Sequence, residues 1–145
     1  MKKISSENIF KLFEIDDVEV YEPERLKDLM SDDHYLLNMC VRGIENFWVM
    51  DKISKAKHGE SYNKYHYKIK TKYFLKMFNY LNKVNLNRIE PFFDTVQELG
   101  YGTVENSLKE LMDLFIELEY YEKCAKIKRI LDLLRRLFYP EHALD

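Results

Sequence analysis

Glycine and proline are scarce in this sequence. Its 145 residues include four glycines and three prolines. A β-sandwich or β-barrel needs many tight turns, which these two residues supply, so their scarcity argues against an all-β fold. An apolar fraction of 46% and an aromatic fraction of 14% argue against a disordered chain. We therefore expect an all-α protein that folds as a single domain over residues 1–145.

Long hydrophobic runs are also missing. No uninterrupted apolar stretch approaches the roughly 18 residues that a membrane-spanning helix needs, and no apolar segment of the signal-peptide type follows Met1. We therefore expect a cytoplasmic protein with no membrane partner. Only two cysteines occur, Cys40 and Cys124, on apolar helix faces and without metal-site spacing, so we expect reduced core thiols.

The common catalytic motifs are absent as well. The sequence has no Walker loop, HExxH or GxSxG, and no carboxylate stands three residues before any of its four histidines. We therefore expect no metal site, no cofactor and no enzymatic activity. One alternative stays open: Arg136 and His142 have an Arg-x5-His spacing that resembles the pair of the small all-helical HEPN ribonucleases, although Pro140 interrupts the helix between them.

Helical periodicity is what the sequence does have. Apolar spacings of three and four predict long helices over about 33–57 and 61–84, and a shorter one with Pro91 in its first turn that ends near Leu99. Apolar residues surround most of the segment 33–57, so we expect it at the centre of a compact bundle of five to seven helices. Ser31 is its expected N-cap, and Gly43 predicts a close helix crossing.

Three further elements are expected in the segment before residue 31. A short first helix capped by Ser5 or Ser6, an acidic stretch over 14–24 that is extended for a few residues, and a helix from Pro23 to Met30 are expected there.

Two hydrophobic seams lie in the C-terminal segment 103–138. The first ends at Leu118 and the second begins at Tyr120, two residues later. A step of two residues is about 200° at 100° per residue, so one continuous helix would direct the two seams to opposite sides. A turn at 117–119 lets both seams face one interior. We therefore predict an antiparallel helical hairpin over about 103–138, with Thr103 as its N-cap.

The second helix of this predicted hairpin carries a family resemblance. Several of its residues match the acidic, aromatic, small and aliphatic positions of a known motif: Glu119, Tyr121, Glu122, Ala125, Ile127 and Ile130. This C-terminal quarter resembles the UVR motif, the short helical hairpin of bacterial excision-repair subunits and some Clp-protease adaptors. It departs from the motif at Cys124, where Ala is usual, and at Lys128 and Arg129, where Arg-Asp is usual. In that family the hairpin binds another helical hairpin, so the resemblance implies protein association and no chemistry.

The first predicted function is therefore protein binding. The second hairpin helix is apolar on more than one side, because Ile130, Leu133 and Leu137 lie off its main seam. We predict a small adaptor or regulator that binds a helical partner, or a second copy of itself, through a surface that contains Tyr121 and these three residues. A hairpin packed wholly within its own domain would need the same breadth, so burial in the core is the open alternative.

The second predicted function is nucleic-acid binding. Four lysines repeat every fourth residue along the helix 61–84 and form what we call the lysine row: Lys64, Lys68, Lys72 and Lys76. Such a row can follow a nucleic-acid backbone, and four nearby tyrosines are candidates for stacking on bases: Tyr62, Tyr65, Tyr67 and Tyr73. The acidic stretch 14–24 can instead neutralise the row within the molecule.

Overall fold

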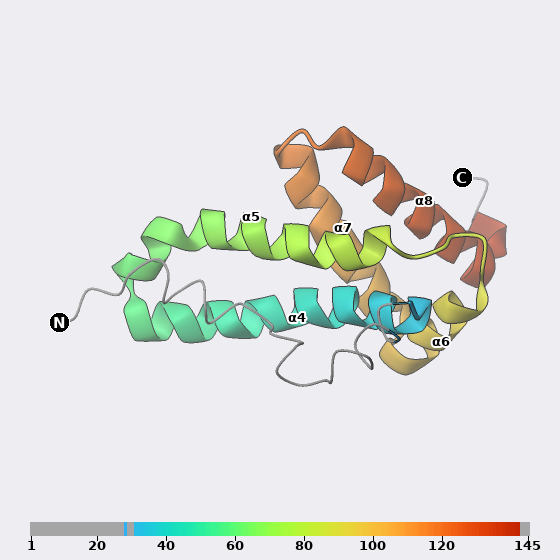
Figure 1. Ribbon diagram of the computed structural model, residues 1–145, viewed down its shortest axis with the longest axis horizontal. Coiled ribbons are helices and arrows are strands. Elements are labelled where there is room, and N and C mark those ends of the chain that lie inside the picture. Colours follow the sequence, from blue (N-terminus) through green and yellow to red (C-terminus); the bar gives the residue numbers. More distant parts are fainter. Residues whose placement is uncertain (1–27, 29–30, 143–145) are drawn as a thin grey trace.

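The described part of the chain is helical throughout its regular structure. The computed structural model describes residue 28 and residues 31–142. Within them are five α-helices and one 3-10 helix: α4 (Asp33–His58), α5 (Glu60–Asn82), α6 (Glu90–Leu99), α7 (Tyr101–Glu117), α8 (Tyr121–Phe138) and η1 (Pro140–His142). The predicted all-α bundle is thereby confirmed (Figure 1). The first predicted helix, the acidic stretch 14–24 and most of the helix ending at Met30 lie outside the described residues.

The helices α4 and α5 are the longest two and run side by side in opposite directions (Figure 1). Gly59 joins them with a φ of 51° and a ψ of −123°, a conformation that glycine adopts without the steric cost of a Cβ atom. The N-cap of α4 is Asp32, whose carboxylate accepts hydrogen bonds from the amides of His34 (2.9 Å) and Tyr35 (3.4 Å). The prediction of Ser31 as N-cap is therefore wrong by one residue.

The close helix crossing predicted at Gly43 is confirmed. A Cβ atom at this position would lie 2.0 Å from the sulfur of Met77 on α5. The hydroxyl of Tyr73, also on α5, donates a hydrogen bond of 2.8 Å to the Gly43 carbonyl. Met77 and Tyr73 are both buried. The missing side chain of Gly43 thus lets the backbone of α4 approach α5 closely.

The hydrophobic core lies where α4 meets its neighbours. This helix packs against α5, α6 and α7, whereas α8 packs against α7. Aromatic rings fill the centre: the ring centroid of Phe47 lies 5.5 and 5.2 Å from those of Tyr73 and Phe74. The central place expected for the segment 33–57 therefore fits its contacts with three other helices.

One part of the expectation for α4 is wrong. The first half of the helix is buried as predicted, but the second half exposes three large apolar side chains: Trp48 (37%), Val49 (58%) and Ile53 (42%). Apolar residues on all sides of this segment predict that it is buried on all sides. Here they cover a core face and part of the protein surface.

The C-terminal helices α7 and α8 follow one another through a short turn at the predicted place. The first helix ends at Glu117, and Tyr120 immediately precedes the second. The predicted N-cap at Thr103 is wrong, because α7 already begins at Tyr101 and Gly100, with a φ of 90°, both ends α6 and precedes α7. Both hydrophobic seams contribute to the core through a buried set of side chains: Val104, Leu108, Leu111, Phe115, Ile127, Leu131 and Leu134.

Candidate interaction surface at the turn between α7 and α8

The turn between α7 and α8 is a Schellman motif. The amide of Tyr120 donates to the carbonyl of Phe115 at 2.8 Å, and the amide of Glu119 donates to that of Ile116 at 3.0 Å. The motif usually includes an apolar contact across the turn, and here the rings of Phe115 and Tyr120 lie 6.0 Å apart. The last carbonyls of α7 are thereby satisfied, and the start of α8 has a defined direction.

Glu119 occupies the position of this motif where glycine is usual. Its φ is 61°, and it is the one non-glycine residue with a positive φ among those described. The left-handed conformation costs a residue with a Cβ atom roughly 1–2 kcal/mol. The turn is therefore strained at Glu119, and the hydrogen bonds and the ring contact on either side hold it in place.

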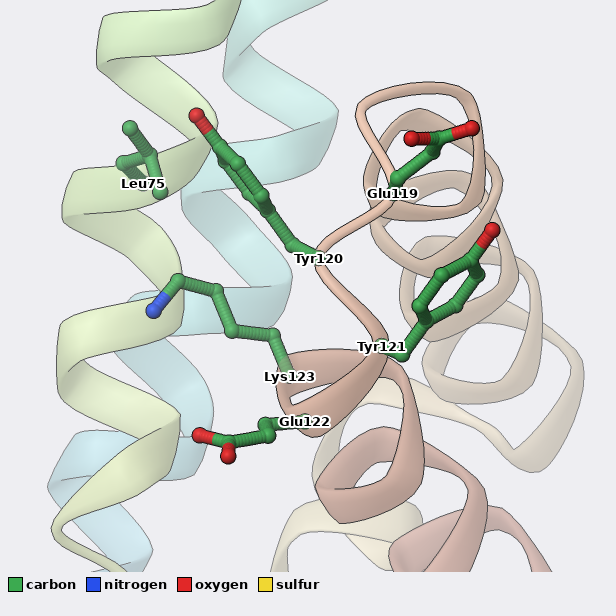
Figure 2. Close-up of a pocket in the computed structure, with 6 residues that line it drawn as sticks. All are labelled: Leu75, Glu119, Tyr120, Tyr121, Glu122 and Lys123. Atoms are coloured by element: carbon green, nitrogen blue, oxygen red, sulfur yellow. The ribbon is translucent and has the colours of Figure 1, made fainter.

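Two consecutive tyrosines are displayed by this turn. Tyr120 is 39% exposed and Tyr121 is 65% exposed. An open pocket of about 470 Å³ lies beside them, lined by Leu75 of α5 and by the residues 119–123 (Figure 2). Figure 2 shows Tyr120 and Lys123 pointing towards α5, whereas Tyr121 points away from it. The turn thus presents aromatic surface on two sides.

The pocket has mixed chemistry. The ammonium group of Lys123 lies 5.2 Å from the ring centroid of Phe78 and 5.9 Å from that of Tyr120, within the range of cation–π attraction. Glu119 and Glu122 add carboxylates to the lining. Aromatic, aliphatic and charged groups therefore meet in one concave place, which suits the anchor residue of a protein partner.

The four residues predicted as one protein-binding surface do not lie together. Ile130 is fully buried at 0% exposure, so it belongs to the core and its prediction as a surface residue is corrected. Leu133 and Leu137 are half-buried and pack against that core. At 100° per residue Tyr121 lies about 180° around α8 from Ile130, and about 24 Å along the axis from Leu137. Of the four, Tyr121 alone is strongly exposed.

The lysine row is partly a surface feature. Lys64, Lys68 and Lys72 are exposed, Lys76 is half-buried, and both Lys72 and Lys76 take part in further interactions within the molecule. The tyrosines proposed for base stacking divide in two. Tyr62 (0% exposed) and Tyr73 (3%) belong to the core, so that role is excluded for them, whereas Tyr65 is half-buried and Tyr67 is 51% exposed.

A buried polar cluster joins α4 to α5 near their connection. Asp51 is 3% exposed, and its Oδ1 accepts a hydrogen bond of 2.5 Å from the hydroxyl of the buried Tyr62. The same oxygen lies 2.9 Å from Nε2 of His66, and Oδ2 lies 3.2 Å from the ammonium group of Lys55. These contacts satisfy a carboxylate that the core would otherwise exclude.

Opposing effects set the ionisation of this cluster. Burial disfavours the charge of Asp51 and by itself raises its pKa, but the hydrogen bonds from Tyr62 and Lys55 and the nearby His66 outweigh burial, so the pKa of Asp51 lies below its ordinary value. Burial, and then the hydrogen bond to Asp51, raises the pKa of Tyr62 above its ordinary value. Asp51 is therefore a charged structural tie between two helices.

A second polar cluster ties α4 to α6 at the surface. His34, Asn38 and Arg42, spaced by four along α4, contact the Glu98 carboxylate at 3.0, 2.9 and 2.6 Å. The hydrogen bond from Asn38 lowers the pKa of Glu98, burial opposes it, and His34 and Arg42 add to the lowering. The guanidinium of Arg42 thus forms an ion pair with Glu98 that links α4 to α6.

The residues of the ribonuclease alternative lie at the other end of α8. The side chain of Arg136 is exposed and its Nε donates to the Asp132 carbonyl at 3.5 Å, while His142 is the last residue of η1. The side chain of His142, and with it the proposed pair, lies outside the part of the chain that the structure describes. The same part of the chain contains no group of three His, Cys, Asp or Glu side chains arranged to hold a metal ion. None of its helices combines the length and apolarity required to cross a bilayer.

Both cysteines are free thiols. Cys40 is buried, and burial raises its pKa to about 12, while Cys124 is half-buried and its pKa is also raised by burial. A raised pKa keeps a thiol protonated and poorly nucleophilic near neutral pH.

Comparison of the chain with protein-family models, with curated proteins and with solved structures found no match. The resemblance of the C-terminal quarter to the UVR motif therefore stays a prediction.

Sequence reasoning missed the surface around Trp48 and the cluster around Asp51. Both had a signal. Asp51 follows the apolar run from Phe47 to Met50 and so stands where a core face continues, and Tyr62 stands eleven residues later on the core face of the next helix. A carboxylate in such a position predicts a buried partner.

Proposed function

We propose that this chain is a small, non-enzymatic cytoplasmic adaptor or regulator that binds a helical protein partner through its C-terminal helices α7 and α8. The observation that carries the proposal is the Schellman turn that displays Tyr120 and Tyr121 beside an open pocket. Tyrosine is enriched at protein interfaces, because its ring can be buried while its hydroxyl keeps a hydrogen-bond partner. A side chain that is 65% exposed contributes little to its own fold, so Tyr121 is the residue most suited to binding.

The conformation of Glu119 supports the same proposal. Strained backbone residues persist where the surrounding structure holds them, and they cluster at binding and catalytic sites. In this turn the conformation of Glu119 sets the direction in which the side chain of Tyr121 points. The pocket between Leu75 and Tyr120 has room for one anchor side chain of the partner, which is the usual form of an interface hot spot.

The resemblance to the UVR motif also favours protein binding. Of the six matching positions, the four at Glu119, Tyr121, Glu122 and Ala125 are exposed, whereas Ile127 and Ile130 are buried. A third of the pattern is thus explained by folding, and the exposed part is available to contact a partner. The resemblance implies another helical hairpin as that partner, either in a different protein or in a second copy of this chain.

Site-specific photo-crosslinking tests the proposal. A benzophenone amino acid in place of Tyr121, in the full chain within its native cells, should form a discrete adduct on irradiation. The same amino acid in place of Tyr139, which is 44% exposed at the far end of α8, is the matched control. We expect adducts at position 121 and none of the same mass at position 139.

The masses of the adducts decide between partners. An adduct near twice the chain's 17.6 kDa indicates a second copy, and any other discrete mass indicates a different protein. Tyr121→Ala should abolish the complex while changing the free energy of unfolding by no more than about 0.5 kcal/mol, as is usual for surface positions. Equal labelling at both positions, or none at position 121, would contradict the proposal.

Nucleic-acid binding through the lysine row is the second candidate, favoured by the exposure of Lys64, Lys68 and Tyr67 on one helix. Binding to a phosphate backbone through four lysines makes affinity fall steeply between low and physiological salt. A fluorescence-anisotropy titration with single-stranded DNA and RNA at both salt concentrations measures this. No binding at low salt would dismiss the candidate.

A further inference from the structure

A second concave surface lies where α7 crosses α4 and α5. It is a groove of about 360 Å³, and it shares no lining residue with the pocket at the turn. Its apolar part comes from Trp48 of α4, which is 37% exposed, and Ile116 of α7, which is 51% exposed. Exposed tryptophan and isoleucine side by side form a surface whose burial by a partner is favourable.

The α7 side of this groove is acidic, and we call the whole surface the acidic groove. Glu110, Asp113 and Glu117 follow one another at spacings of three and four, so their carboxylates line one side of α7 over about 10 Å. Glu110 accepts a hydrogen bond of 2.6 Å from the indole of Trp48. Loss of water and the carboxylate of Glu117 raise the pKa of Tyr67 beside the groove.

The side chains that line the acidic groove carry a net negative charge. Lys70 is the one cation in its lining, against three carboxylates. In the described ranges none of those carboxylates forms a salt bridge. The ammonium group of Lys70 lies 5.3 Å from the ring centroid of Trp48, so this ring already accepts a cation over its face.

We propose that the acidic groove binds a basic amphipathic helical segment of a partner protein, with arginine or lysine side chains against the α7 carboxylates and an aliphatic side chain against Trp48 and Ile116. The carboxylate spacing matches a helical ligand with cations on one face, the mode by which amphipathic helices enter grooves. Arginine suits the site best, because its planar guanidinium both pairs with carboxylates and stacks on indole.

The charges argue against one obvious internal occupant. The stretch 14–24 of this chain has six acidic residues and no basic residue, so the carboxylates of the groove would repel it. A basic external segment has the complementary charge, and it would remove the net negative charge of the lining. This inference is independent of the function proposed for the turn, because the two surfaces have different lining residues.

Trp48 makes the test direct, because it is the only tryptophan in the chain and lies in the groove. The probe is a synthetic amphipathic peptide of about 14 residues, long enough to form a helix when bound, with arginine at positions i, i+3 and i+7 and leucine on the same face. Titrated into the full protein at low salt, it should shift the emission of Trp48 to saturation. A peptide with glutamate in place of each arginine should leave the emission unchanged.

Charge-neutral variants locate the binding. Asp113→Asn combined with Glu117→Gln should lower the affinity for the arginine peptide about tenfold. This is the combined effect expected from the loss of two partly exposed ion pairs. The control, Glu119→Gln combined with Glu122→Gln, removes the same charge from the neighbouring pocket and should change affinity less than twofold. Circular dichroism should show the same helicity for both proteins, since all four positions are exposed.

Three outcomes would overturn the proposal. They are no emission change with the arginine peptide, equal binding of the glutamate peptide, and equal weakening by both pairs of substitutions. An emission shift that depends on the concentration of the protein alone would assign the groove to a second copy of the chain instead. Failure here leaves the crosslinking result at Tyr121 unaffected, so the two surfaces are tested separately.

Discussion

The pair α4–α5 and the pair α7–α8 are built by the same device with different chemistry. In each, two consecutive helices are joined through a residue with a positive φ. Between α4 and α5 this residue is Gly59 with a φ of 51°, and between α7 and α8 it is Glu119 with a φ of 61°. The first turn is free of strain, whereas the second keeps a Cβ atom where glycine would be more stable.

The two pairs also differ in where they place polar and aromatic groups. The α4–α5 pair buries the Asp51 carboxylate and its partner Tyr62 between the helices. At Gly43 it also packs the backbone of α4 against the side chain of Met77. The α7–α8 pair contributes an apolar seam to the core and turns Tyr120 and Tyr121 outwards. We infer that the first pair mainly stabilises the fold and the second mainly serves recognition, which the following changes test.

The largest effect is expected at Gly43. Replacing it with valine places carbon atoms where the buried Met77 sulfur lies, and overpacking of this kind costs about 3 kcal/mol. Gly102→Val is the matched control within α7, because a side chain there meets nothing within 4 Å, and we expect a change below about 0.5 kcal/mol. Urea denaturation of the two variants measures the difference.

A variant of the partner residue separates overpacking from other causes. Met77→Ala removes the atoms that valine would meet, so Gly43→Val should cost much less in that background than in the native chain. If the two substitutions are additive, the crossing at Gly43 is not limited by Met77, and the picture of a tightly packed first pair fails.

The next effect is expected at Asp51. Asp51→Asn keeps the shape but removes the charge that receives the Tyr62 hydrogen bond and contacts Lys55, which should lower stability at pH 7 by about 2 kcal/mol. The folded pKa of Asp51 is depressed, so its contribution is fully present above the unfolded value of about 3.9 and is lost as pH falls through the folded value. The difference between native and variant proteins should therefore shrink below about pH 4.

Denaturation midpoints measured from pH 7 down to pH 2.5 check this dependence. Glu98→Gln is the control, because the Glu98 carboxylate has a similar number of partners but lies at the surface, where water screens its interactions. Its effect at pH 7 should be much smaller. A difference between native protein and Asp51→Asn that stays constant over the whole pH range would show that charge is not the reason.

Part of this comparison could be read from the sequence. The long helices and the turn after Glu117 followed from apolar spacing, because spacing reports which side of a helix is buried. The crossing at Gly43 followed from the presence of a glycine inside a predicted helix. The caps were placed less well. Asp32 prevails over the adjacent Ser31 because its carboxylate reaches two amides, and Gly100 ends one helix while preceding another, which leaves no cap for Thr103.

The division between surface and core on α8 could not be read in the same way. Tyr121 and Ile130 both lie off the main seam, and both were assigned to one binding surface. Which of them is buried depends on how α8 lies against α7 and the core, and the sequence of α8 alone does not contain that information. The same is true of Trp48, which is 37% exposed although apolar residues surround most of its helix.

The smallest and sharpest difference is expected at the two turns, where opposite substitutions should have opposite effects. Gly59→Ala introduces a Cβ atom at a φ of 51°, in open space, so backbone strain alone should lower stability by about 1 kcal/mol. Glu119→Gly relieves the strain at a φ of 61° but makes the unfolded chain more flexible, so the net gain should be about 0.5 kcal/mol. Urea denaturation resolves both changes when native protein is measured beside them. A loss of stability in both variants would mean that the Glu119 side chain stabilises the turn more than its conformation costs, and the left-handed residue would then be no sign of a site shaped for binding.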